Sequence, residues 1–514
     1  MKRPMKVLLT ILVFWQLHFL LAQAQELLEL KPNRKQLFID DYIISKLSNL
    51  ERRLHQPTKY SGNPILRPAH PWENLIIQTR NAPFWDPAEK TWKLFYFGFA
   101  LHKGKIVHTT CYATSKDGID WQKPNLNLVE WQGSKNNNLI TDYEREDSFL
   151  YHVVYDPRDV PERRYKGLFG LHSTRQPAIS ADGFHWKFLD VPGVPSEDES
   201  QLNYDEFGNQ FIATVKHEGP YRRAVFLSLS KNFDKWTKPE LIFHADGRDQ
   251  QLGRERIAQR LTDPRLVPVT INKPDDYNTD IYNMSVFPYE GLYLGMPSKF
   301  DQSGASPIGN QDGFHQVELV SSRDLHSWSR VADRAIFLPN SHAGQGVYDT
   351  GTIMPPTRPI LRDDELWFYY SGIKWRFHPD NMKTNPDGTI TYVLIPDSGA
   401  ILLAKLRLDG FVSMDADELE GTLLTRPMTL RGKRLYVNAN AQGGELRAEI
   451  LFEDRRKGVM EPFSRNNSIP IEGDQLRGEL KWQKVPDLSK LNGQTVRIRF
   501  VLRKASLYSF WMGE

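Results

Sequence analysis

The sequence predicts an all-β protein, a five-bladed β-propeller followed by a small β-sandwich. Two observations indicate this fold class. A short phrase with Ser, an acidic turn, Gly and Trp recurs along the chain, and an aromatic-rich strand precedes each copy. Aromatic residues make up 12% of the 514 residues, while 34 Gly and 33 Pro divide the chain into short segments. Frequent Gly and Pro residues are typical of a chain with many short strands, and a recurring unit is typical of a repeat architecture.

The chain begins with a segment that we expect to be removed. Three basic residues among the first six precede a largely apolar run at residues 7–21, and Ala22-Gln23-Ala24 offers a small-x-small cleavage site. This pattern predicts a secretory signal peptide at residues 1–24. We therefore expect a secreted or periplasmic protein without a membrane anchor.

The mature chain is close to neutral. The sequence holds 66 Lys and Arg against 63 Asp and Glu, and removal of the three basic residues of the signal peptide leaves 63 against 63. This balance gives no reason to expect nucleic acid as a partner. Cys111 is the single cysteine, so no internal disulfide can form. Its alternating strand, residues 107–114, predicts a buried thiol.

The recurring phrase marks five units. Its copies lie at residues 113–121, 178–186, 230–236, 322–328 and 406–411, the last with Phe in place of Trp. Asp and Gly favour a tight turn, and Trp favours packing between neighbouring sheets. We interpret the phrase as structural.

A second recurring pattern lies upstream of each copy, a polar turn followed by a strand dense in aromatics. These strands are expected at residues 92–99, 165–171, 210–215, 292–296 and 366–370. Each unit then resembles one four-stranded antiparallel blade. Five blades predict a propeller over residues 25–420.

The pattern changes after the fifth unit. Residues 421–514 show alternating segments separated by Gly- and Asn-containing turns, which predicts a β-sandwich. The expected strands cover residues 434–438, 445–452, 477–482, 496–502 and 506–511. The last of them is too apolar for a free tail, so we expect it to lie within a sheet.

Acidic residues stand near the start of each unit. They are Glu73, Asp147, Glu199, Asp280 and Asp349. Because the innermost strands of a propeller converge on a central funnel, these carboxyl groups are expected to form a ring. Like charges that crowd together raise one another's pKa, and a glycosidase uses this to keep one carboxyl group protonated beside an ionised one.

Further polar and aromatic residues lie near the same strand ends and suit a sugar ligand. We expect substrate contacts from Arg80, Arg223, Asp280, Tyr282, Asn283, Asp349, Trp375 and His378. Sequence signatures of serine hydrolases, zinc peptidases and phosphate-binding loops are absent, and His102 and His108 do not have a metal-ligand spacing. No cofactor and no metal are expected.

With these residues in hand, the chain resembles the secreted five-bladed propeller glycosidases, the broad group that includes glycoside hydrolase families 32, 43, 68, 117 and 130. The features that carry the resemblance are Asn63-Pro64-Ile65-Leu66, the phrase at residues 113–121 and the closing segment at residues 408–413. The appended sandwich is similar to the C-terminal module of family 32 enzymes.

The resemblance implies catalytic acids at the starts of the first three blades. The matching positions are Glu73 as base or nucleophile, Asp147 as modulator and Glu199 as general acid, although families 32 and 43 have Asp where this chain has Glu73. The implied function is a hydrolase that cleaves glycosidic bonds in plant or algal polysaccharide fragments. A non-catalytic glycan-binding propeller and a glycoside phosphorylase remain as alternatives.

Overall fold

The computed structural model describes residues 28–514 except 308, 389 and 394. The predicted signal peptide at residues 1–24 lies outside this part of the chain. The described residues form strands for the most part, with one α-helix, α2 (Gly247–Thr262), among them, which confirms the all-β prediction. In the same residues, no helix has the length and apolarity that crossing a membrane requires.

The chain divides into two compact units. One is Leu54–Val412, and the other combines residues 28–53 with Ser413–Glu514. The first strands of the described chain therefore belong to the same unit as its C-terminal part. The sequence patterns did not indicate this arrangement.

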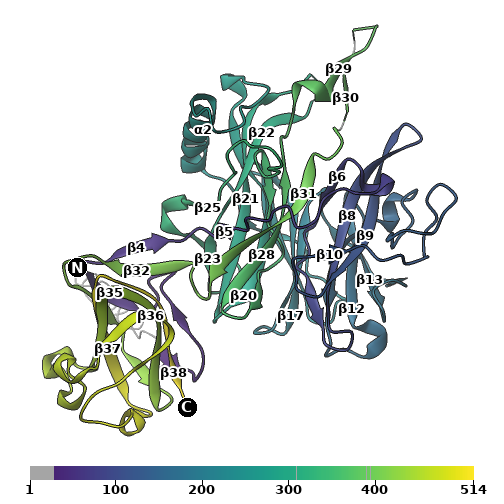
Figure 1. Ribbon diagram of the computed structural model, residues 1–514. Helices are drawn as coiled ribbons and strands as arrows, with labels where there is room; N and C mark the ends of the chain where they lie inside the picture. Colours follow the sequence, from purple (N-terminus) through teal and green to yellow (C-terminus); the bar gives the residue numbers. More distant parts are fainter. Residues whose placement is uncertain (1–27, 308, 389, 394) are drawn as a thin grey trace, which may run out of the picture. The chain divides into compact units, whose positions relative to one another are not determined.

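The Leu54–Val412 unit holds four large sheets built from antiparallel hairpins (Figure 1). The ten-stranded sheet contains β5 (Thr58–Lys59), β6 (Ile76–Gln78), β7 (Phe84–Asp86), β8 (Thr91–His102), β9 (Lys105–Ser115), β10 (Trp121–Gln122), β26 (Thr352–Met354), β27 (Ile360–Arg362), β28 (Glu365–Ile373) and β31 (Gly399–Arg407). The five-stranded sheet contains β11 (Leu150–Tyr155), β12 (Tyr165–Phe169), β13 (Thr174–Ser180), β14 (Lys187–Phe188) and β15 (Val194–Pro195).

The other two large sheets follow in the chain. The four-stranded sheet contains β16 (Ser200–Asp205), β17 (Gln210–Gly219), β18 (Arg222–Ser230) and β19 (Glu240–Phe243). The six-stranded sheet contains β20 (Asn278–Tyr289), β21 (Leu292–Ala305), β22 (Gln311–Glu318), β23 (Val320–Ser322), β24 (Trp328–Arg330) and β25 (Ile336–Leu338). A small hairpin pairs β29 (Met382–Thr384) with β30 (Ile390–Tyr392).

Short 3₁₀ turns connect these strands. They are η1 (Pro71–Glu73), η2 (Glu146–Ser148), η3 (Pro161–Arg163), η4 (Pro274–Asp276), η5 (Ala332–Arg334) and η6 (Pro379–Asn381).

Successive sheets pack on one another in chain order. Phe95 of β8 contacts Tyr165 of β12, with ring centroids 6.4 Å apart. Leu168 of β12 clusters with Leu202 of β16, and further apolar contacts join the four-stranded sheet to β20. The last strands return to the first through a parallel pair between β31 and β6. That these sheets form a closed propeller of five blades stays a prediction.

The recurring phrase forms the same turn in four copies. In the first, Asp117 Oδ1 accepts the backbone N–H groups of Ile119 and Asp120, each at 2.9 Å, while Trp121 Nε1 donates to the Gly118 carbonyl at 3.2 Å. Gly118 has φ +75°, and a Cβ there would lie 2.6 Å from the Tyr369 hydroxyl. The phrase therefore supplies a turn and a packed indole, in agreement with its structural interpretation.

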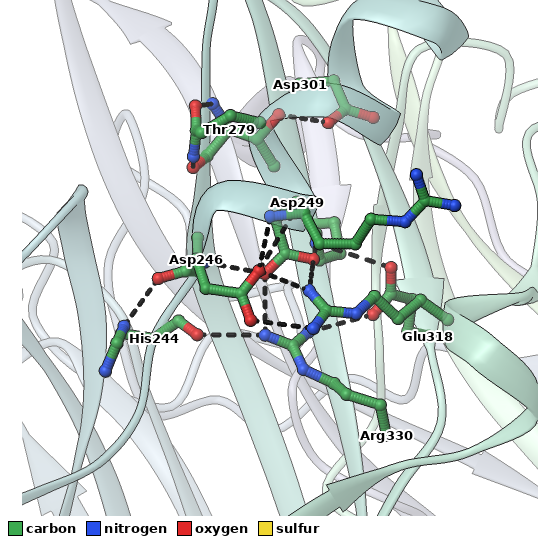
Figure 2. A network of polar contacts seen from close by, with 12 residues as sticks. His244, Asp246, Asp249, Thr279, Asp301, Glu318 and Arg330 are labelled. Atoms are coloured by element: carbon green, nitrogen blue, oxygen red, sulfur yellow. Dashed lines mark hydrogen bonds and ion pairs between the residues drawn. The ribbon is translucent and has the colours of Figure 1, made fainter.

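Helix α2 is held to the six-stranded sheet by a dense network of charges (Figure 2). Asp246 caps its N-terminus in a capping box with Asp249. Asp249 lies fully buried and pairs with Lys299 of β21, with Arg330 Nη2 at 2.7 Å and with Arg334 Nη1 at 2.8 Å. Burial by itself would raise the pKa of Asp249, but Lys299 and the arginines outweigh it and lower that pKa.

The other unit contains one connected sheet of eleven strands (Figure 1). These are β1 (Leu28–Leu30), β2 (Gln36–Leu37), β3 (Ile44–Ser48), β4 (Glu51–Leu54), β32 (Val412–Ala416), β33 (Gly421–Thr425), β34 (Met428–Leu430), β35 (Arg434–Phe452), β36 (Ile471–Leu480), β37 (Thr495–Arg503) and β38 (Ala505–Gly513). Its 3₁₀ turns are η7 (Arg455–Lys457), η8 (Glu461–Phe463), η9 (Arg465–Asn467) and η10 (Ser489–Leu491).

The C-terminal strand of this unit is well paired. β38 pairs with β35 over most of its length and with β32, and Leu507, Phe510 and Met512 are fully buried. The expectation that the apolar end of the chain lies in a sheet is thus confirmed. The strands expected at 434–438 and 445–452 are one bulged strand, β35, which bends within the sheet.

Candidate active site

A cavity of about 290 Å³ lies in the Leu54–Val412 unit where the large sheets come together. Three of the large sheets contribute to its wall, with Gln78, Phe97 and His108 from the first, Tyr151 from the second and Tyr282 from β20, and Glu199 joins them from directly before β16. Concave sites with aromatic walls and a few convergent polar groups are typical of small-ligand binding.

Glu199 is the most firmly positioned acid on this cavity. Its side chain is 8% exposed, and both carboxylate oxygens accept hydrogen bonds from the Arg80 guanidinium, at 3.0 Å to Nε and 2.6 Å to Nη2. Asn283 Nδ2 donates to Glu199 Oε2 at 2.6 Å. A bidentate guanidinium and an amide fix the carboxylate in place, and all three contacts use its oxygens as acceptors.

Arg80 is in turn held by its surroundings. It is almost fully buried, its guanidinium lies 5.4 Å from the Phe97 ring centroid, and Nη1 donates to Gln78 Oε1 at 3.2 Å. Burial alone would lower the pKa of Arg80, but Glu199 outweighs it, so that pKa is raised. Arg80 is therefore a cation of the cavity wall that Glu199 holds in place.

A second acid, Asp198, stands beside Glu199. Its side chain is 44% exposed, it pairs with Lys216 Nζ, and the Tyr282 hydroxyl donates to Asp198 Oδ2 at 3.4 Å. Burial would raise the pKa of Asp198, but Lys216, followed by Arg223 and Arg376, lowers it overall. Asp198 is thus a carboxylate with one side open to the cavity.

Aromatic rings complete the wall. Phe97, Phe99, Tyr151, Tyr282 and Trp375 all line the cavity. His378 lies against Trp375, with ring centroids 4.7 Å apart, and supports that ring from outside the lining. Flat apolar faces beside carboxylates suit the faces of a sugar ring, because a sugar carries C–H groups on its faces and hydroxyls around its edge.

A buried histidine, His315, packs against Tyr282, with ring centroids 4.8 Å apart. Its ring also stacks on Phe300 at 4.1 Å, and its Nδ1 lies 3.1 Å from the Thr352 hydroxyl oxygen. Burial lowers the pKa of His315 most strongly, and nearby cations, with Arg376 and Arg223 foremost, lower it further. Arg376 also lines the cavity.

The structure brings Glu199, Arg80, Tyr282 and Trp375 together on the cavity, with Asn283 and His378 directly behind them. The five predicted acids do not form a ring, since Glu199 alone among them belongs to the lining. Each of the other four has a different partner, as follows.

Asp280 and Asp349 are buried away from the cavity. Asp280 Oδ2 accepts from Arg223 Nη1 at 2.8 Å and from Gln302 Nε2 at 2.6 Å. Burial raises the pKa of Asp280 although Arg223 opposes the shift. Asp349 pairs with Lys59 Nζ at 2.6 Å and accepts the Tyr370 hydroxyl at 2.8 Å. Both acids anchor neighbouring strands.

Asp147 and Glu73 also lie away from the lining. The Asp147 side chain is 68% exposed in η2 and pairs with Arg145, whose hydrogen bond lowers the pKa of Asp147. Glu73 has no exposed surface at all: it pairs with Lys123, and its Oε2 accepts the Tyr96 hydroxyl at 2.7 Å. Glu73 therefore lacks the access to a substrate that the expected role of base or nucleophile requires.

Replacement of Glu73 by Gln tests this placement. The change leaves the buried ammonium of Lys123 without a counter-charge, so we expect a stability loss of about 1.5–3 kcal/mol, read as a lower midpoint in urea unfolding. Turnover per folded molecule stays unchanged. A variant that is as stable as the parent but inactive would instead place Glu73 in the reaction.

Sequence reasoning missed Asp198 and Arg376. Asp198 directly precedes Glu199, just before a predicted strand. This position next to a predicted site residue could have indicated that Asp198 also lines the site. Arg376 lies between Trp375 and the turn η6. No sequence pattern in this segment distinguishes Arg376 as a site residue. Within the described residues, no group of three or more His, Cys, Asp or Glu is placed to hold a metal ion.

Comparisons with known proteins give only distant similarities. No family model and no curated protein matches this sequence. A glycosyl hydrolase from Bacteroides ovatus is 12% identical with a TM-score of 0.41, covering 73% of this chain and 97% of that one. An N-acetylgalactosamine deacetylase from F. plautii, solved with blood group B trisaccharide, is 14% identical with a TM-score of 0.37, covering 71% and 97%. Similarities this distant assign no activity.

Proposed function

We propose that the protein is an exported glycoside hydrolase that cleaves glycosidic bonds in plant or algal polysaccharide fragments. The observation that carries the proposal is the carboxylate pair Asp198 and Glu199 on one small aromatic-walled cavity. Glycoside hydrolysis needs two carboxyl groups, or a carboxylate and another proton donor, on either side of the scissile bond. The pattern of residues 1–24 supports export.

The packing of the sheets in chain order, and the return of β31 to β6, support a five-bladed propeller as the scaffold. In such a fold the inner strands of all blades border one funnel. A C-terminal sandwich accompanies it in this proposal.

The roles differ from those implied by family resemblance. Glu199, held as a triple acceptor by Arg80 and Asn283, stabilises the positive charge that develops on the sugar ring. Asp198, the more open carboxylate, acts as base toward water or as nucleophile. The proton for the leaving oxygen comes from His108 or His172, because both line the cavity and an imidazole ring N–H can donate a proton.

A panel of plant and algal oligosaccharides tests the proposal. We expect the full mature chain to release reducing ends from at least one of them in phosphate-free buffer. Release that requires added phosphate would favour a phosphorylase, for which Arg376 on the cavity wall offers an anion contact. Binding without release would favour a non-catalytic glycan-binding protein. The absence of both binding and release would reject a glycan function.

A further inference from the structure

A second cavity, of about 480 Å³, adjoins the first. Two residues, His108 and Leu171, line both cavities and form the wall between them. We call the second cavity the hairpin pocket, because the tip of the β8–β9 hairpin forms one side of it. Its lining consists of His102, Lys103, Lys105, Ile106, Val107, His108, Tyr143, Glu144, Arg145, Phe149 and Leu171.

His102 gives the pocket an unsatisfied polar group. Its side chain is 7% exposed, and neither ring nitrogen has a hydrogen-bond partner in the described structure. Its ring packs between Trp131, at 4.8 Å, and Tyr143, at 5.4 Å between centroids. A buried imidazole without any partner is costly, and such groups usually meet a ligand or a water. His102 is therefore placed to bond a polar guest.

The charges of the hairpin pocket favour an anionic guest. Lys103 pairs with Glu144 only at 3.5 Å, and both side chains are more than half exposed. Arg145 is engaged by Asp147. Lys105 takes part in no ion pair and no side-chain hydrogen bond among the described residues, and it is exposed at the rim. Three lining cations thus stand beside one lining carboxylate, and of these three Lys105 is the one without a partner.

Apolar surface lies beside these cations. Tyr143, Phe149 and Ile106 line the same pocket, and Ile106 is 41% exposed. A pocket that combines aromatic faces, cations and an unsatisfied imidazole suits a sugar that carries an acidic group. Neutral sugars would use the aromatic faces but leave the Lys105 ammonium unpaired.

We propose that the hairpin pocket is a subsite for the next unit of a linear acidic glycan, one that bears a carboxylate or a sulfate, while the adjoining cavity holds the unit at which the bond is cleaved. This inference rests on the proposed function, since it extends the same site. Two cavities that share a wall fit two consecutive units of one chain, and the hairpin pocket selects for charge.

Binding titrations with defined oligosaccharides test the subsite. The probes are oligogalacturonides and carrageenan oligosaccharides of one to four units, which carry carboxylates and sulfates respectively, together with methyl-esterified oligogalacturonides as neutral chains. We expect at least one charged series to bind, with affinity that rises with length and falls with added salt. Binding by neither series, or equal binding of the esterified chains, would overturn the inference.

Substitutions locate the binding. Lys105→Glu and His102→Phe are each expected to weaken the binding of charged tetramers about tenfold, as loss of one charge-assisted contact predicts, while binding of the monomer stays unchanged. Lys238→Glu is the matched control, because Lys238 is also exposed and lies outside both cavities. If Lys105→Glu and Lys238→Glu bind tetramers equally well, the pocket is not a subsite.

The outcome separates this inference from the proposed function. Suppose that binding rises with chain length and Lys105→Glu weakens it, but no reducing ends are released. This result would retain the subsite and reject hydrolysis. Hydrolysis whose KM for charged tetramers is the same in Lys105→Glu and in the parent would retain the function and reject the subsite.

Discussion

Replacement of Glu199 by Gln lowers kcat on the oligosaccharide found by panel screening by on the order of 10³-fold or more, with a much smaller change in KM. The physical reason is the loss of a negative charge that Arg80 and Asn283 hold beside the reacting sugar. A neutral amide cannot stabilise an oxocarbenium-like transition state as a carboxylate does. The measurement is steady-state release of reducing ends, normalised to folded protein.

The chain offers a matched control two residues away. Glu197 is exposed, does not line the cavity, and uses only its backbone groups in hydrogen bonds, to Arg175 and Lys216. Glu197→Gln removes the same charge and is expected to retain full turnover. Equal kcat in Glu199→Gln and the parent would remove Glu199 from the reaction and leave Asp198 as the sole candidate carboxylate.

A Gln at position 199 also disturbs its neighbours, and this effect has to be separated from catalysis. The carboxylate offers two acceptor oxygens to three N–H donors, whereas an amide offers one oxygen and brings two donors of its own. A modest fall in thermal stability is therefore expected. Glu199→Asp, which keeps the charge but shortens the reach to Arg80, should retain stability better while still losing most of kcat.

The strands of the Leu54–Val412 unit could be predicted because their determinants are local. Gly118 at φ +75° and Asp117 as acceptor fix a turn through contacts within six residues, so the phrase alone indicates where a strand ends. Helix α2 also has a local signal, the capping box of Asp246 and Asp249, although the repeat pattern alone predicts only strands. By contrast, the pairing of β1 with β34 joins residues 400 positions apart, and nothing in residues 28–30 specifies it.

The candidate site was predicted where side chains lie on the inner strands or directly beside their ends. Glu199 precedes β16 and reaches the cavity, and Tyr282 lies on β20. Glu73 occupies a similar place in the sequence, but η1 turns it into the sheet, where Lys123 from 50 positions further along neutralises it. Whether an acid faces a cavity or a buried cation depends on such distant partners, and spacing along the chain does not encode them.

The charge network beside α2 supports the second prediction, a large loss of stability in Lys299→Met. Lys299 lies on β21, is fully buried, and its ammonium pairs with Asp249 and, at 3.4 Å, with Glu318. Methionine fills a similar volume but leaves two buried carboxylates with less compensating charge. Breaking a buried ion pair in this way typically costs about 3–5 kcal/mol.

The consequence extends to the candidate site, because the network holds the hairpin that carries Tyr282 and Asn283. Gln250 of α2 exchanges two hydrogen bonds with the Thr279 backbone at the start of β20, and Thr279 Oγ1 donates to Asp301 Oδ1 at 2.8 Å. We therefore expect Lys299→Met to lower the unfolding midpoint of this unit and to weaken glycan binding before global unfolding.

Lys238→Met, at an exposed position, is the control and should match the parent. Recovery of part of the lost stability in the double variant Lys299→Met with Asp249→Asn would show that the uncompensated carboxylate is the cause, whereas a further loss would show that Arg330 and Arg334 still need the Asp249 charge.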